Sequence, residues 1–161
     1  MTGPKPTSQP PAPCLVVADG PAAIDFYKAA FGAEETFRMM SPDGRRVLHA
    51  NLVVNGGPVM LSDDFPEYNG GRSRDPKGLG GTPVTIHLQV ADADAVFARA
   101  LEAGCTAVMP LADMFWGDRY GKLLDPFGHE WSIATTIATP TREEMDAAVQ
   151  SLFGQGGCQG Q

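Results

Sequence analysis

The stretch LVVAD at residues 15–19 is matched 73 positions later by LQVAD at residues 88–92. Each copy reads as a short strand that ends in an aspartate able to cap a helix. A run of helix-forming residues follows each aspartate and stops at a glycine, Gly32 in the first copy and Gly104 in the second. Glycine in this place is typical of a helix C-terminus. The sequence therefore predicts an internal duplication in which each copy begins with a strand and a helix.

Three strand-like runs follow each predicted helix, and turn signals rich in Gly, Asn, Asp and Pro separate them. The helices are expected at 21–31 and 93–103, and the strands at 35–40, 47–54, 58–62, 106–111, 122–124 and 129–135. The final turns of the two copies align with a spacing of 71 residues between Gly57 and Gly128. This order predicts an α+β fold of two βαβββ modules, whose strands form a curved mixed sheet with the helices outside.

The chain has 161 residues, which is the size of one ordinary domain. We expect module one at 13–66, a linker at 67–82 and module two at 83–137. The tails, 1–12 and 154–161, are rich in Pro or Gly and are expected to be disordered. The segment 138–153 should hold a last helix, because Thr141 and Glu144 form a capping box. Its apolar residues Met145, Val149, Leu152 and Phe153 should dock it onto the body or onto a partner subunit.

Composition excludes several classes of protein. The net charge is −7, and an acidic surface repels both nucleic acid and anionic membranes. No apolar run is long enough for a membrane span, and the proline-rich N-terminus does not resemble a secretory signal. The cysteines Cys14, Cys105 and Cys158 are odd in number and form no CxxC pair. This pattern predicts a reduced, cytoplasmic protein without a thiolate zinc site.

The concave face of the predicted sheet is the natural place for a pocket, because alternate strand residues must line it. His49 and His87 both lie in the middle of predicted strands. Each is either a pocket acid/base or ligand, or a hydrogen-bonded histidine of the core. His129 follows a turn, where a bracing role is favoured. The three histidines share no metal-binding spacing such as HxH or HExxH.

The stretch from Asp113 to Gly121 is the most unusual of the chain, with Phe115, Trp116, Arg119 and Tyr120 between glycines. We interpret it as a loop that closes over a flat or hydrophobic ligand, in which Trp116 stacks and Arg119 supplies charge. The alternative is a loop held together by aromatic packing. No nucleophile has a visible base partner, and no catalytic carboxylate stands out.

Three stretches carry a resemblance to a known family: AAIDFYKAAFGAEE (22–35), LHANLVVNGGPVMLSDDFP (48–66) and DMFWGDRYGKLLDPFGHEWSI (113–133). Together with the duplicated module they resemble the vicinal oxygen chelate (VOC) superfamily of glyoxalases, bleomycin-resistance proteins and extradiol dioxygenases. The likeness covers about residues 13–137 and is strongest to the PhnB-like branch. It implies paired βαβββ modules around a concave sheet, commonly assembled as homodimers.

The metal-using members of that superfamily place one ligand on each of four strands. Carried onto this chain, those positions fall on Ala12 or its neighbourhood, Leu61, Thr85 and Ser132. None of these is a usual ligand of a divalent metal. His87, two residues from Thr85 on the same face, could replace one ligand but not three. The resemblance therefore implies a relative without a metal cofactor, like the bleomycin-resistance proteins that hold their ligand between aromatic side chains.

Our leading hypothesis is a homodimer that binds a small organic molecule and uses no metal. The residues expected to bind the ligand are His49, Met60, Thr85, His87, Phe115, Trp116, Arg119, Tyr120 and Ser132. The alternative is a metal-dependent lyase, transferase or dioxygenase that uses His49, His87 and a residue of the other subunit. A structural or regulatory role without a ligand is the third class. Whether the modules pair within one chain or between two chains stays open.

Overall fold

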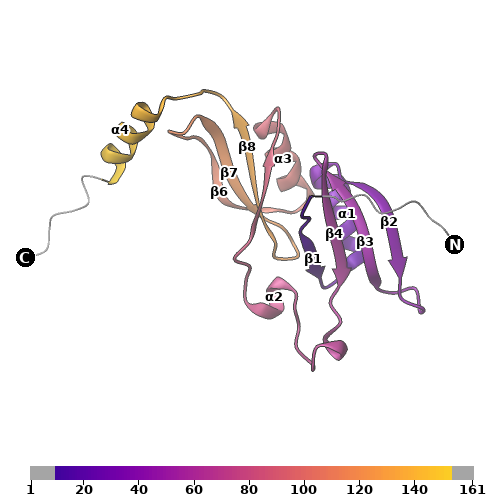
Figure 1. Cartoon of the computed structure of the whole chain (residues 1–161). Helices are drawn as coiled ribbons and strands as arrows, with labels where there is room; N and C mark the ends of the chain where they lie inside the picture. Colours follow the sequence, from indigo (N-terminus) through magenta and orange to yellow (C-terminus); the bar gives the residue numbers. More distant parts are fainter. Residues whose placement is uncertain (1–9, 154–161) are drawn as a thin grey trace, which may run out of the picture.

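The computed structural model describes residues 10–153, and it shows the βαβββ unit twice (Figure 1). The predicted disordered tails therefore lie mostly outside the described residues, as does Cys158. Module one consists of β1 (Cys14–Val17), α1 (Gly20–Phe31), β2 (Glu34–Met40), β3 (Val47–Val54) and β4 (Gly57–Asp63). Module two consists of β5 (Thr85–Gln89), α3 (Ala93–Ala103), β6 (Thr106–Asp113), β7 (Asp118–Leu124) and β8 (Glu130–Thr136).

The strands form two four-stranded mixed sheets with the same topology, β1-β4-β3-β2 and β5-β8-β7-β6. In each sheet the first strand runs parallel to the last, and the other neighbours are antiparallel. The α+β class and the duplication are thus confirmed. No hydrogen-bonded ladder joins the two sheets within residues 10–153.

The two helices begin and end as their sequences predict. Asp19 accepts a hydrogen bond from the backbone N–H of Ala22, and Asp92 accepts one from Ala95, so each aspartate caps its helix. Gly32 has a φ of 67°, a left-handed conformation that lets the chain leave α1 at little steric cost. The local signals of the repeat therefore translate directly into structure.

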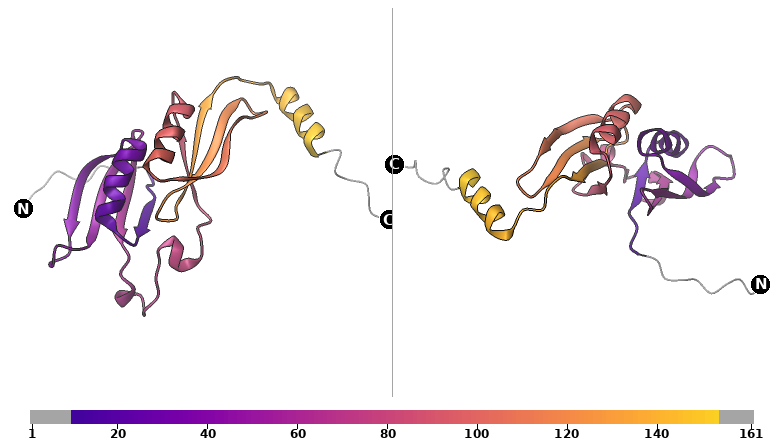
Figure 2. Two further views of the ribbon diagram at one scale, coloured as in Figure 1. Left: turned by 180° about the vertical axis from the view of Figure 1, so that it is seen from behind. Right: turned by 90° about the horizontal axis from the view of Figure 1, so that it is seen from above.

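The modules pack together through their helices, and α1 and α3 lie side by side at the centre of the molecule (Figure 2). One core cluster contains residues from both sheets and both helices. Its largest side chain, Trp131 of β8, lies 4.5 Å from Phe31 of α1 between ring centroids. The hydroxyl of Tyr27 in α1 donates a 2.8 Å hydrogen bond to Asp125 of module two.

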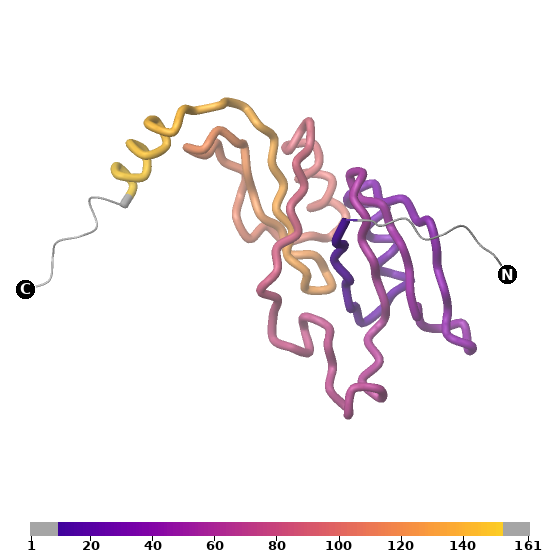
Figure 3. The backbone as a smooth tube through the Cα atoms, in the orientation of Figure 1, coloured from indigo at the N-terminus to yellow at the C-terminus, as the bar shows by residue number. Residues whose placement is uncertain are grey.

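The segment that joins the modules runs along one side of the molecule, below both modules in the view of Figure 3. It holds a 3₁₀ turn (Pro66–Tyr68) and the short helix α2 (Pro76–Leu79). Within the described chain no helix is long and apolar enough to cross a membrane. The predicted C-terminal helix exists as α4 (Arg142–Phe153), and it stands away from both sheets (Figure 1).

One stretch differs from its prediction. The sequence indicated a loop over 113–121, but β6 reaches Asp113 and β7 begins at Asp118, so only residues 114–117 turn. Gly121 lies inside β7. This position is a glycine because a Cβ there would come within 2.9 Å of the Phe97 ring of α3. The glycine serves close packing of a helix on a strand, and it does not mark the end of a loop.

Candidate functional site

Each sheet has one side packed against the helices and one side that α1 and α3 leave uncovered. On the uncovered side of the first sheet the strand register brings together Cys14, Phe37, Met39, His49, Asn51 and Met60. We call these residues the module-one open face. The corresponding side of the second sheet carries Thr85, His87, Gln89, Tyr120, Lys122, Glu130 and Ser132. We call these residues the module-two open face.

A chain of hydrogen bonds crosses the module-two open face. His87 lies 2.8 Å from the Ser132 hydroxyl through Nδ1 and 2.9 Å from Gln89 Oε1 through Nε2. The Gln89 amide donates to Thr136 Oγ1 at 2.8 Å and to Asp118 at 3.3 Å. Because both ring nitrogens of His87 have partners, the orientation of the imidazole is fixed by its neighbours.

An ion pair lies at the other end of the same face. Lys122 Nζ is 2.8 Å from Glu130 Oε1, and the hydroxyl of Thr85 also donates to this carboxylate. The hydrogen bonds from Lys122 and Thr85 lower the pKa of Glu130, and the Glu130 carboxylate raises the pKa of Lys122. The charges of Lys122 and Glu130 compensate each other, so this end of the face presents a paired cation and anion.

A row of aromatic side chains lies beside these hydrogen-bonded residues. The ring of Tyr120 lies almost parallel to that of His87, at 19° and 6.3 Å between centroids. Trp116 meets Tyr120 edge to face at 5.7 Å, and Phe115 meets Trp116 at 5.0 Å. The indole N–H of Trp116 donates to Asp118 at 3.1 Å. This row, Phe115, Trp116, Tyr120 and His87, offers stacking surface at the edge of a polar floor.

Arg119 does not join this group. Because it follows Asp118 and precedes Tyr120 in β7, strand alternation points it to the opposite side of the sheet. There its guanidinium binds Asp94 of α3 at 2.6 Å and Asp113 at 3.0 Å. The Asp94 and Asp113 carboxylates raise the pKa of Arg119 further. Arg119 therefore connects β7 to the helix and does not reach the aromatic row.

His49 and Met60 lie on the module-one open face, on the other sheet from the aromatic row. His49 Nε2 is 2.9 Å from Asn51 Oδ1, and its ring lies 6.1 Å from that of Phe37. A small cavity of about 180 Å³ beside them is lined in part by Thr36, Asn51 and Met60. The predicted ligand-binding residues thus divide between two surfaces within a single chain.

The strand register also corrects the position that matches a metal ligand on β4. Cys14 pairs with Met60 as His87 pairs with Ser132, so Met60 is the equivalent of Ser132. Leu61 faces the core and is fully buried. The four ligand positions then hold Ala12, Met60, Thr85 and Ser132, which supply a thioether and two hydroxyls that are poor donors for a divalent cation. Residues 10–153 contain no group of three or more His, Cys, Asp or Glu side chains that could hold a metal ion.

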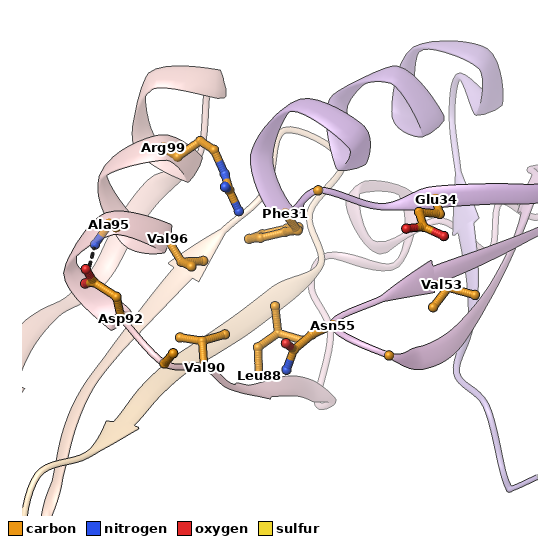
Figure 4. A pocket seen from close by; sticks show the side chains of 13 residues that line it. Phe31, Glu34, Val53, Asn55, Leu88, Val90, Asp92, Ala95, Val96 and Arg99 are labelled. Carbon is orange, nitrogen blue, oxygen red and sulfur yellow. Dashed lines mark hydrogen bonds between the residues drawn. The ribbon is translucent and has the colours of Figure 1, made fainter.

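A separate cleft of about 450 Å³ opens between the modules (Figure 4). Phe31 and Asn55 line it from module one, and Val96 and Arg99 line it from module two. Arg99 Nε donates to the carbonyl of Ala30 at the end of α1, and Asn55 donates to the carbonyl of Gln89. The polar groups of this cleft therefore hold the modules together. His129 has a similar bracing role, because its Nε2 lies 3.0 Å from the Val16 carbonyl.

The sequence did not point to Gln89 and Asp118. Gln89 lies two positions after His87 on the same strand, so period-two alternation alone could have placed it on this face. Asp118 was read as part of a loop. Once β7 is known to start there, the same alternation aligns Asp118, Tyr120 and Lys122. Both residues orient aromatic or imidazole rings through their hydrogen bonds.

Two βαβββ modules, each with one uncovered sheet face, define the fold class of this protein. Residues 10–133 match the model of the Glyoxalase/Bleomycin resistance protein/Dioxygenase superfamily, and the chain belongs to this superfamily. Uncharacterized protein Rv0887c of Mycobacterium tuberculosis is 53% identical over 140 residues, which cover 87% of this chain and 82% of that protein.

Solved structures agree with this assignment. The Arabidopsis thaliana gene product At5g48480 superposes with a TM-score of 0.62 at 30% identity, covering 80% of this chain and 99% of that one. TioX from Micromonospora sp. ML1 superposes with a TM-score of 0.58 at 25% identity, covering 78% of this chain and 97% of that one.

Proposed function

We propose that this protein binds a small, flat organic molecule on the module-two open face, in the manner of a PhnB-like member of the superfamily and without metal catalysis. The observation that carries the proposal is the aromatic row, which stands beside a polar floor whose groups are already paired. A planar ligand can stack on Trp116 and Tyr120 while the floor stays hydrogen-bonded.

The donor set supports the metal-free part of the proposal. The hydroxyls at the two ligand positions of module two are engaged, Thr85 with Glu130 and Ser132 with His87. His49 and His87, the histidines of the alternative metal-dependent enzyme, lie on different sheets and bind Asn51, Gln89 and Ser132.

We further propose a homodimer in which the open face of module two is covered by the open face of module one from a second copy. Phe37 and Met39 on the module-one open face are 44% and 49% exposed in the single chain. Large apolar side chains of this kind are expected at an interface between subunits. His49 and Met60 would then meet the aromatic row of the partner, which reunites the two halves of the predicted site.

We place the protein in the cytoplasm, where the free, exposed thiol of Cys14 stays reduced.

A titration tests the binding site. Quinoline, a flat aromatic probe, is added to the full-length protein in a calorimeter. We expect Trp116→Ala to weaken its binding by roughly tenfold, which corresponds to about 1.4 kcal/mol of lost stacking. Tyr68→Ala is the matched control, because Tyr68 is an exposed aromatic of the linker. Equal affinities of Trp116→Ala and the unsubstituted protein would refute the assignment of the aromatic row.

A second measurement tests the absence of metal chemistry. The purified protein is analysed for metals, stripped with a chelator and titrated with Zn²⁺, Ni²⁺, Mn²⁺ and Fe²⁺. We expect no stoichiometric metal and no binding at micromolar concentrations. A tight site for any of the four would instead favour the metal-dependent alternative.

A further inference from the structure

Helix α4 is an amphipathic arm that the body of its own chain leaves bare. Met145, Ala148, Val149 and Leu152 follow one another at helical spacing and form one apolar stripe. Leu152 is 62% exposed. In every view α4 lies at one end of the molecule and β2 of module one lies at the other (Figures 1 and 2). Within residues 10–153 the stripe therefore packs against neither sheet.

The first turn of α4 is nevertheless stabilised by side-chain hydrogen bonds. The backbone N–H of Thr141 donates to Glu144 Oε2 at 2.7 Å, and the N–H of Glu144 donates to Thr141 Oγ1 at 3.2 Å. This reciprocal pair is a capping box. A helix of 12 residues is marginal in water without tertiary contacts. The stripe therefore needs a surface to cover it.

The joint before α4 directs the helix away from its own module. The N–H groups of Ile137 and Ala138 both donate to the carbonyl of Gly117, at 2.8 Å and 3.0 Å. Gly117 has a φ of 98°, and a Cβ there would overlap the Ala138 carbonyl and come within 2.7 Å of Pro140. The chain leaving β8 is thus fastened to the turn that carries Trp116, so the arm has a set direction and is not a free tail.

We propose that the apolar stripe of α4 packs on the module-one open face of a second copy of this chain. This inference rests on the homodimer proposed above and names the element that holds it together. The receiving surface is formed by Phe37 and Met39 of the edge strand β2, which are the exposed large apolar side chains of that face. Because α4 and β2 lie at opposite ends of one chain, only the arm of another copy reaches this surface.

Charge favours the same partner. Beside its stripe α4 carries Glu143, Glu144 and Asp146, and its single cation, Arg142, is already bound to Asp146 at 2.9 Å. The hairpin between β2 and β3 follows directly after Met40 and carries Asp43, Arg45 and Arg46. Arg46 is already bound to Glu67 at 2.6 Å, whereas no ion pair engages Arg45 among the described residues. An acidic arm that docks on Met39 therefore meets the Arg45 guanidinium. In a two-fold dimer each copy gives one arm and receives one.

Light scattering of the full-length protein across a dilution series tests the arm. We expect a mass of twice 17.0 kDa for the unsubstituted chain. Val149→Glu should raise the dissociation constant of the dimer at least tenfold, because it places a charge in the stripe. Gln150→Glu is the matched control, with the same charge change on the opposite, exposed side of α4, and should leave the dissociation constant unchanged. Neither residue packs on the body, so both variants should fold like the parent by circular dichroism.

Cross-linking identifies the receiving surface. In a background of Cys14→Ser and Cys158→Ser, Met39→Cys and Val149→Cys are introduced in separate chains. When the two chains are mixed and oxidised with oxidised glutathione, they should form a disulfide-linked dimer. A monomeric parent would overturn both the homodimer and the arm. A dimer that resists Val149→Glu, or that gives no cross-link between these positions, would leave the homodimer standing and overturn the arm.

Discussion

The two modules follow the same chain path but differ on the faces that their helices leave uncovered. On the helix side, equivalent positions carry similar residues: Leu15 and Leu88 are both buried, and so are Leu61 and Ile133. On the open side, Cys14 of module one stands where module two has His87. Packing restricts the residue type on the helix side, whereas the open sides differ. Module one carries Phe37, Met39 and Met60 beside His49 and Asn51, and module two carries a polar and aromatic set.

Module two supplies the buried carboxylate at the contact between the modules, and its removal gives the largest expected loss of stability. Asp125 of module two is 3% exposed and accepts hydrogen bonds from Tyr27 of module one, from Trp131 and from the backbone N–H groups of Phe127 and His129. Asp125→Ala leaves these buried donors without an acceptor. We expect the free energy of unfolding in urea to fall by about 3 kcal/mol or more.

Tyr27→Phe is the control for that change, because it removes one hydroxyl and keeps the ring in the core. It should lower the free energy of unfolding by about 1 kcal/mol. An Asp125→Ala protein as stable as the parent would show that the modules do not depend on this carboxylate.

The next largest loss of stability is expected in the first turns of α1 and α3. The equivalent positions there, Gly20 and Ala93, differ by one methyl group. Gly20 donates its N–H to the buried carboxylate of Asp63, and Ala93 donates its N–H to the hydroxyl of Thr135, both at 2.8 Å. A Cβ at Gly20 would fall 2.8 Å from the Cβ of Val47. Gly20→Ala should therefore destabilise the protein by about 1–3 kcal/mol through overpacking.

The reverse exchange in module two, Ala93→Gly, should lower the free energy of unfolding by no more than about 1 kcal/mol, since it only loosens the start of a helix. Thermal and urea unfolding of both variants measure the difference. If Ala93→Gly proved the more harmful of the two, the close approach at Gly20 would not be the reason for its glycine.

Local signals predicted the repeat, both helix caps and the capping box of α4, because each depends on residues a few positions apart. The reading of 113–121 as a loop was wrong for a reason that lies outside that stretch. Gly121 makes room for Phe97 of α3, and no local rule reveals this long-range contact. The error carried over to Arg119, which strand alternation sends to the opposite side of the sheet from Tyr120.

The candidate site was also predictable only in part, because local spacing predicts which residues share a face but does not fix the strand register. Strand alternation predicts that Thr85 and His87 share one face, the resemblance to the superfamily implies Ser132, and the structure brings the three together. The resemblance implies Leu61 as the ligand position of β4, whereas the strand register makes Met60 the equivalent of Ser132, at a spacing of 72. A shift of one residue in a strand exchanges the core side for the open side.

The smallest expected effect concerns charges that module one has and module two lacks. Glu35 of β2 binds Lys28 of α1 and Arg38, both at 2.6 Å, whereas the strand register places the exposed Ala107 at the equivalent position of module two. The hydrogen bonds from Arg38 and Lys28 lower the pKa of Glu35 to about 2. Because this pKa lies below that of glutamate in the unfolded chain, near 4.3, the contribution of the Glu35 ion pairs to stability is fully present above about pH 5 and is lost as the pH falls toward 2.

Glu35→Gln should lower the free energy of unfolding by about 1 kcal/mol at pH 6, since the pair is partly exposed to solvent, and by almost nothing at pH 2. Urea unfolding of both proteins from pH 6 to pH 2 measures this convergence, and two parallel curves would mean that the ion pairs of Glu35 do not stabilise module one.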